Sequence, residues 1–97
     1  EDVYSYAGVD KNNVVIETIK KAEDGEGTVI RLYERDNAKT SVKLFVDTEF
    51  TQAFTCDLLE NEEAELKVEE TVNAYGKKVK EVSLKLKPFE VYTVKFK

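Results

Sequence analysis

The residues of this chain that could perform chemistry are mostly acidic. Twenty of the 97 residues are Asp or Glu, and seven of them gather in one stretch: Asp57, Glu60, Glu62, Glu63, Glu65, Glu69 and Glu70. Such a cluster suits calcium, which takes several oxygen ligands at one point. The spacing matches no calcium loop, however, and alternation along a strand sends neighbouring carboxylates to opposite faces. We therefore favour a solvated strand edge, where charge blocks edge-to-edge pairing.

Catalysis by the usual side-chain constellations has little support in the sequence. Paired carboxylates could serve glycoside hydrolysis, but with 20 acids among 97 residues some pair will meet the required separation by chance. The chain has no histidine, so the commonest general base and metal ligand is missing. Cys56 has no partner for an internal disulfide, and we expect it to be a small buried hydrophobe. We predict no catalytic, cofactor-binding or metal-binding residue here.

Two other features could bind a ligand. The segment Asp24-Gly25-Glu26-Gly27 places two carboxylates beside glycines, but it fails the phosphate-binding glycine patterns, and turn chemistry explains it. Exposed tyrosine rings beside polar groups are typical of sugar-binding surfaces. We predict Tyr33, Arg35 and Tyr75 as candidate contacts to carbohydrate or to a protein interface, although tyrosines on strands mostly pack their rings.

The elements that would position these residues are β-strands, because apolar residues recur with period two through most of the chain. The expected strands include Val14 to Ile19, Thr28 to Arg35, Val42 to Val46 and Phe89 to Phe96. A first strand would begin at Val3 and Tyr4, and another would span Gln52 to Leu58 with Phe54, Cys56 and Leu58 inward. Further alternation covers Ala64 to Val68 and Val82 to Lys87, while Thr71 to Lys78 reads as a loop. Seven to eight short strands predict an all-β, antiparallel two-sheet β-sandwich of immunoglobulin-like topology.

Composition limits the class of protein further. The chain is 41% hydrophobic and 36% charged, a balance typical of one globular domain spanning residues 1–97. A net charge of −5 argues against nucleic-acid binding, which needs clustered lysines and arginines. The longest apolar run has three residues, so we expect no membrane-spanning helix. The chain opens on EDVYSY without Met, from which we expect a piece of a larger protein.

Three patches, in order, resemble one enzyme family. The first is Asn13-Val14-Val15-Ile16-Glu17-Thr18-Ile19-Lys20-Lys21-Ala22-Glu23-Asp24, followed by Val29-Ile30-Arg31-Leu32-Tyr33-Glu34. The others are Thr55-Cys56-Asp57-Leu58-Leu59-Glu60 and Leu84-Lys85-Leu86-Lys87-Pro88-Phe89-Glu90-Val91-Tyr92-Thr93. Together they are similar to the C-terminal β-sandwich of glycoside hydrolase family 38 α-mannosidases, and they span most of the chain from Asn13 to Lys97.

This resemblance implies a specific role. Members of the family are retaining exo-mannosidases that bind a divalent metal, usually zinc, in an N-terminal α/β domain absent from this chain. None of that domain's nucleophile or ligand motifs occurs here, so no catalytic residue carries over. The resemblance implies a noncatalytic accessory domain whose partners are the remaining domains of a bacterial, cytoplasmic α-mannosidase. The alternative is a carbohydrate- or protein-binding module, which would bind mannosides on its own.

Overall fold

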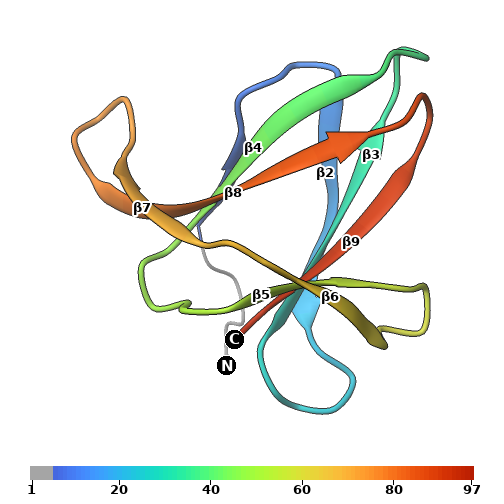
Figure 1. The fold of residues 1–97 in the computed structure, drawn as a ribbon. Coiled ribbons are helices and arrows are strands. Elements are labelled where there is room, and N and C mark those ends of the chain that lie inside the picture. The colour runs from blue at the N-terminus through green and yellow to red at the C-terminus, as the bar shows by residue number, and fades with distance from the viewer. Residues whose placement is uncertain (1–5) are drawn as a thin grey trace.

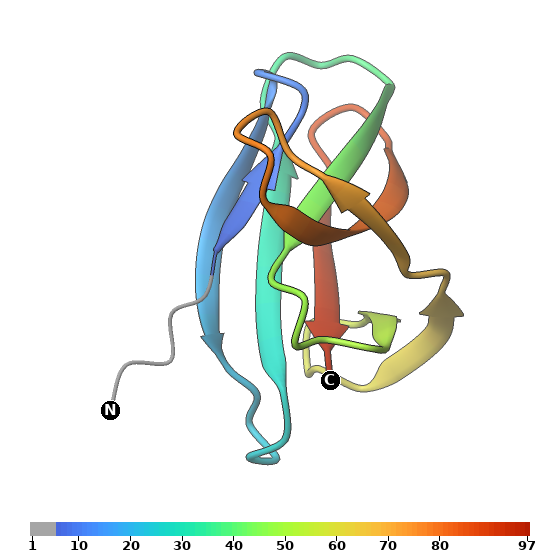
Figure 2. The ribbon, with the colours of Figure 1, turned by 90° about the vertical axis from the view of Figure 1, so that its left-hand side faces the viewer.

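A computed structural model describes residues 6–97, and these form an all-β arrangement. Nine strands run in chain order: β1 (Ala7–Val9), β2 (Val14–Lys21), β3 (Thr28–Glu34), β4 (Thr40–Val46), β5 (Ala53–Cys56), β6 (Glu62–Leu66), β7 (Glu69–Val72), β8 (Lys78–Leu86) and β9 (Val91–Phe96). They build a four-stranded sheet in the order β1-β4-β8-β7 and a five-stranded sheet in the order β2-β3-β9-β5-β6. The two sheets lie as separate layers (Figures 1 and 2).

All the strand pairs are antiparallel, which confirms the two-sheet sandwich predicted from the alternation. Immunoglobulin-like topology stays a prediction. The described residues form nine strands rather than seven or eight, because Glu69–Val72 is a further strand, whose last two residues were predicted as the start of a loop. It pairs with β8 at one edge of the four-stranded sheet, opposite the sheet that holds β6. The expected start of the first strand at Val3 and Tyr4 lies outside the described residues.

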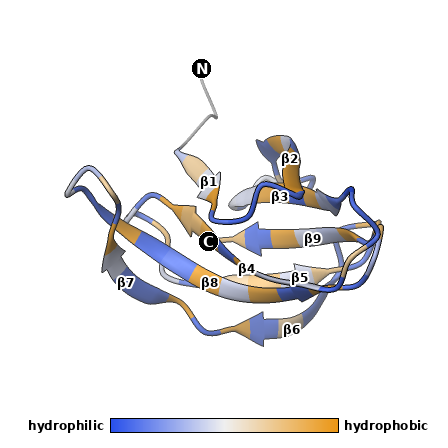
Figure 3. Ribbon diagram, turned by 90° about the horizontal axis from the view of Figure 1, so that it is seen from above, coloured by the Kyte–Doolittle hydropathy of each residue, from blue (hydrophilic) through white to orange (hydrophobic). Residues whose placement is uncertain are grey.

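The core lies between the sheets and follows the alternation closely. One cluster of buried residues comes from both layers: Val14, Ile30, Leu32, Val42, Leu44, Val46, Phe50, Ala53, Val82, Leu84, Leu86, Val94 and Phe96. The rings of Phe50 and Phe96 pack with their centroids 5.5 Å apart. Figure 3 shows the hydrophobic and hydrophilic residues alternating along β8. The period of two therefore assigned one side of most strands to the core, as a half-buried sheet requires.

The orientation predicted for the segment Gln52 to Leu58 is wrong. The register pairs Ala53 with Phe96, so Ala53 faces the core and is fully buried. Phe54 and Cys56 pair with Lys95 and Thr93 and so lie on the opposite face of the sheet. Leu58 has left the strand for a turn and is 75% exposed. Alternation says which residues share a face, but pairing with β9 decided which face is inside.

Candidate functional site

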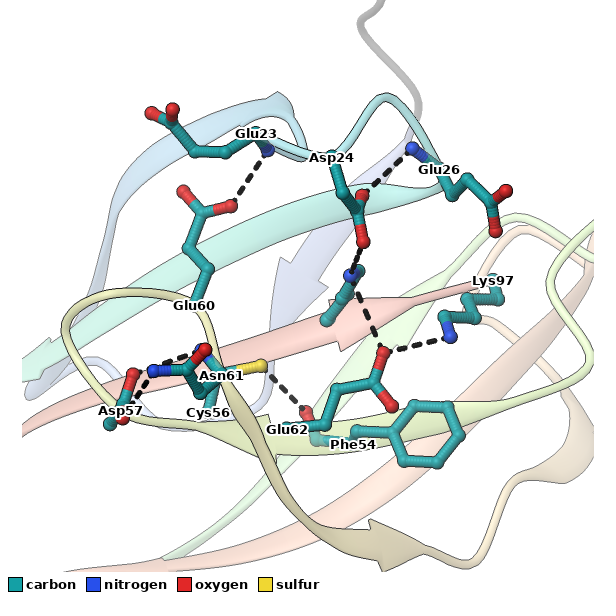
Figure 4. Close-up of polar contacts among 11 residues, drawn as sticks. Glu23, Asp24, Glu26, Phe54, Cys56, Asp57, Glu60, Asn61, Glu62 and Lys97 are labelled. Atoms are coloured by element: carbon teal, nitrogen blue, oxygen red, sulfur yellow. Dashed lines mark hydrogen bonds and ion pairs between the residues drawn. The ribbon is translucent and has the colours of Figure 1, made fainter.

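The outer face of the five-stranded sheet is partly covered by two turns. In the register, Val29, Lys95 and Phe54 form one row across β3, β9 and β5, and Arg31, Thr93 and Cys56 form the next. The β2–β3 loop, residues 22–27, and the β5–β6 turn, residues 57–61, come together over these rows (Figure 4). We call this region, with the lysines and carboxylates that join its parts, the ionic face.

Lys95 is the buried centre of the ionic face. It is only 3% exposed, although it is a lysine on the outer face of the sheet. Its Nζ donates to Asp24 Oδ2 at 2.6 Å and lies 3.3 Å from Glu62 Oε2, which also binds Lys97 Nζ at 2.8 Å. The hydrogen bond to Asp24 raises the pKa of Lys95 and lowers the pKa of Asp24. Lys97, followed by Lys95, lowers the pKa of Glu62. These charges join the β2–β3 loop, β6 and β9.

Glu60 makes the second connection of the ionic face. Its side chain is buried, with Oε2 2.7 Å from Lys20 Nζ and Oε1 accepting the backbone N–H of Glu23 at 2.8 Å. The hydrogen bond with Lys20 lowers the pKa of Glu60 and raises the pKa of Lys20. The Glu60 backbone has φ of 68°, in the left-handed region that side chains other than glycine rarely adopt. The carboxylate therefore ties the β5–β6 turn to the β2–β3 loop.

Asp57 fixes the backbone of the same turn. Its Oδ1 accepts the N–H groups of Leu59 and Asn61, each at 2.9 Å, and its Oδ2 accepts from Asn61 Nδ2 at 3.1 Å. These hydrogen bonds, the one from the Asn61 backbone first, lower the pKa of the Asp57 carboxyl. The backbone adds Glu60 N–H to Asp57 O and Asp57 N–H to Asn61 O. The turn is a three-residue hairpin loop closed by a left-handed residue.

Cys56 is buried under this turn, as predicted, but on the outer face rather than in the core. Burial raises the pKa of its thiol, and Sγ lies 3.9 Å from the carbonyl of Phe54. A thiol with a raised pKa stays protonated near neutrality, and the thiolate is the reactive form. The environment of Cys56 therefore favours packing over nucleophilic chemistry.

A second carboxylate anchor, at the far end of β3, escaped the sequence analysis. Glu34 is fully buried and accepts from Asn13 Nδ2 at 2.7 Å and from the N–H groups of Asp36 (2.9 Å), Ala38 (3.1 Å) and Phe89 (2.9 Å). Desolvation alone would raise its pKa, but these donors outweigh it and lower the pKa to about 2. A signal was available: Glu34 continues the inward alternation of Ile30 and Leu32 into a polar turn.

The acidic stretch does not converge on one point, which argues against the calcium alternative. Glu60 and Glu62 bind lysines of other strands, Glu69 lies 3.1 Å from Lys67, and Glu70 lies 3.7 Å from Lys80. Within residues 6–97 no group of three His, Cys, Asp or Glu side chains is placed to hold a metal ion. The exposed acids along β6 instead resemble the charged strand edge that the sequence predicts.

The arrangement of charges also bears on acid–base chemistry. Every described carboxyl group with a resolved shift has a lowered pKa, because lysines or N–H groups stabilise its ionised form. A general acid near neutrality needs the opposite shift. The carboxylates of the ionic face therefore favour their ionised form and serve to fix loops in place.

The three candidate contact residues are not brought together. Tyr33 lies half-buried on β3, in a row with Val15 and Val91, and Arg35 follows it in the β3–β4 loop, 3.8 Å from Asp36. Tyr75 is 94% exposed at the tip of the β7–β8 hairpin, which belongs to the other sheet. Figure 1 shows this hairpin and the β3–β4 loop on opposite sides of the molecule. Their role in binding stays a prediction.

Comparison with known proteins gives the family. Residues 13–94 match the model of the glycosyl hydrolases family 38 C-terminal beta sandwich domain. This chain belongs to that family. A curated relative, alpha-mannosidase G of Dictyostelium discoideum, is 29% identical over 96 residues. The alignment covers 95% of this chain but 8% of that protein, so the family 38 domain described here spans a small part of its relative's length.

Proposed function

We propose that this chain is a noncatalytic C-terminal accessory domain of an α-mannosidase, a glycoside hydrolase acting on terminal α-mannosides. It stabilises or flanks the catalytic domain and performs no hydrolysis itself. The observation that carries the proposal is the family match over residues 13–94, with a relative named as an α-mannosidase. The carboxylates of the ionic face agree with it, because lysines and N–H groups lower their pKa values, the reverse of the shift that a general acid near neutrality needs.

The divalent metal that the resemblance assigns to the parent enzyme, usually zinc, belongs in this proposal to another domain. The residues of this chain do not fit it. There is no histidine, and carboxylates that could have joined a site are occupied by lysines, as Glu60 is by Lys20 and Asp24 by Lys95. A bacterial origin and a cytoplasmic location are proposed on the resemblance alone. No helix of the described residues is long and apolar enough to cross a membrane.

The alternative is a carbohydrate- or protein-binding module, and one observation favours it. Tyr75 presents its ring almost fully to solvent on a hairpin whose backbone is fixed by Asn73 Oδ1, which accepts from Tyr75 N at 2.9 Å and Lys77 N at 3.0 Å. An exposed tyrosine ring on an ordered backbone can stack on a sugar or a protein surface, and it has few rotatable bonds to immobilise. The separation of Tyr75 from Tyr33 and Arg35 counts against a shared platform.

The proposal is tested on the full parent chain, with the domain present and deleted, and on the domain alone. We expect mannoside hydrolysis from the intact enzyme with zinc or cobalt, none from the domain, and a lower inactivation temperature or lower activity after deletion. Turnover by the domain alone would refute the noncatalytic role. Saturable mannoside binding by the domain, abolished by Tyr75→Ala, would replace the proposal with the alternative. An enzyme unaffected by deletion would refute an accessory role.

A further inference from the structure

The turn between β5 and β6 exposes two adjacent leucines. Leu58 is 75% exposed and Leu59 80% exposed, the largest exposures among the leucine, isoleucine and valine side chains described. Hairpin turns are usually polar, because their residues face water. A single exposed leucine is ordinary, but two at one tip are a small apolar projection that water solvates poorly. We call Leu58 and Leu59 the leucine tip.

The backbone that carries the leucine tip is already ordered. Asp57 accepts the N–H groups of Leu59 and Asn61, and the Glu60 carboxylate is held by Lys20 and Glu23 N–H. Docking such a turn costs little backbone conformational entropy, because its backbone is already held by these hydrogen bonds. Glu60 maintains this geometry against an unfavourable positive φ. Strain that is retained by dedicated contacts is typical of segments with a function.

The surroundings of the leucine tip are polar, as in the rim of a contact. A hollow of about 300 Å³ is lined by Lys20, Glu23, Leu58, Leu59 and Glu60, and a smaller one of about 140 Å³ by Glu23, Asp24, Leu59, Glu60, Asn61 and Lys95. The Glu23 side chain beside it is largely exposed and lies 3.4 Å from Lys20. An apolar anchor inside a charged rim is the usual anatomy of a small protein contact. A surface complementary to this one needs an apolar socket for the leucines and a basic side chain opposite Glu23.

The size of the leucine tip selects the kind of partner. Stable association of separate chains needs about 800 Å² per partner, far more than two leucines offer. A surface on the same polypeptide needs much less, because the tether raises the effective concentration to about the millimolar range. The relative of this chain is a polypeptide of which the matched region is 8%. We propose that the leucine tip docks into an apolar socket on another domain of the same parent chain.

This inference rests on the proposed function and is tested in the full-length parent. The variant is L58S/L59S, and the control is V72S, which changes another exposed aliphatic side chain, on the edge strand β7, to which no binding role is assigned. We expect L58S/L59S to shorten the half-life of mannosidase activity at a fixed elevated temperature by about tenfold or more. The control should leave the half-life unchanged. Hydrogen exchange at residues 57–62 should be faster in the variant than in the unmodified enzyme.

The outcomes separate the two claims. Equal half-lives and exchange rates for L58S/L59S and the unmodified enzyme, in a parent that deletion of the domain does destabilise, would overturn the docking role and leave the proposed function intact. No effect of the deletion would overturn both. A variant that lost stability equally as an isolated domain would show a folding defect and would also overturn the inference, because exposed leucines should not support the domain's own fold.

Discussion

The β5–β6 turn and the β7–β8 turn have the same pattern of backbone hydrogen bonds, but they differ in the residue that adopts positive φ and in the contacts of that residue. In each turn the first residue, Asp57 or Asn73, accepts the N–H groups of the residues two and four positions later with its side chain. The fourth residue of each turn, three positions after the first, has positive φ. That fourth residue is Glu60 in the first turn and Gly76 in the second. Gly76 relieves the backbone and has nothing within 4 Å of the place of a Cβ. Glu60 strains the backbone but anchors the turn to the β2–β3 loop.

The difference indicates that local sequence suffices to make a hairpin turn, while a buried carboxylate makes it part of a larger surface. The same principle recurs at the other end of the molecule. Phe89 also has positive φ, 59°, and its N–H donates to the buried Glu34. Asn37, with φ of 59°, lies between Asp36 and Ala38, whose N–H groups also donate to Glu34. All three non-glycine residues with positive φ in residues 6–97 therefore lie in turns tied by buried glutamates. The following predictions test how far the anchors, rather than the turns, determine stability.

The largest effect is expected from Glu34→Ala. Three backbone N–H groups and the Asn13 amide lose their acceptor in a buried site, so we expect the melting temperature to fall by more than about 10 °C. Because the folded pKa is about 2, the Glu34 contribution is complete above the unfolded value of about 4.5 and lost as pH falls toward 2. Melting curves from pH 7 to 2 measure both. An unchanged melting temperature would show that Glu34 is not an anchor.

A smaller loss is expected from Glu60→Ala, which removes the anchor and keeps the strain. Lys20 loses its shorter carboxylate contact and the Glu23 N–H loses its acceptor, so we expect a fall of about 5–10 °C in the melting temperature. Thermal unfolding by circular dichroism checks it, with Glu63→Ala on the neighbouring exposed strand as the control. If Glu60→Ala and Glu63→Ala had the same melting temperature, the β5–β6 turn would be no better anchored than the β7–β8 turn.

Two substitutions that exchange glycine and alanine at a positive-φ position measure the backbone strain separately from the anchor. Glu60→Gly should melt about 5 °C above Glu60→Ala, because glycine adopts positive φ without the Cβ clash. Gly76→Ala should lose a similar amount relative to the unmodified domain, since its Cβ would meet open space and only the backbone is strained. Unequal differences at the two positions would mean that the turns differ in more than their fourth residue.

The smallest effect is expected from Asp57→Asn, which gives the first turn the acceptor of the second. The amide oxygen can still accept from Leu59 and Asn61, so we expect a loss of about 2–3 °C at pH 7. The pKa of Asp57 is lowered, so its contribution is present above about pH 4 and declines as pH falls through the folded value. The variant should therefore approach the unmodified domain in acid. A gap that stayed constant down to pH 2 would contradict this.

Much of the fold could be predicted from the sequence because period-two alternation is a local property. It puts Ile30 and Leu32, Val42 and Leu44, and Val82 and Leu84 each on one face of their strand, and the structure buries those faces in the core. It could not orient Ala53 to Cys56, because pairing with β9 decides which face is inside. It also took Thr71 and Val72 for part of a loop, since four residues of an edge strand carry little pattern.

Less of the candidate site could be predicted from the sequence. Tyr33, Arg35 and Tyr75 were selected for exposure and polarity, and the fold separates them, because distance along a chain says little about distance across two sheets. The anchors Glu34, Glu60 and Lys95 were missed, since a charged residue on a strand usually faces water. Only the inward position of Glu34 in the alternation could have indicated one of them.

By itself, the sequence determined the family resemblance, the β-sandwich and most of the core, because each depends on the order and spacing of residues along the chain. Only the tertiary structure decided that Lys95 and Glu60 are buried, that Cys56 lies on the outer face, and that Leu58 and Leu59 project into solvent. These depend on which loops come together over a sheet. A charge can be buried only where distant segments supply its partners, and only the folded chain brings those segments together.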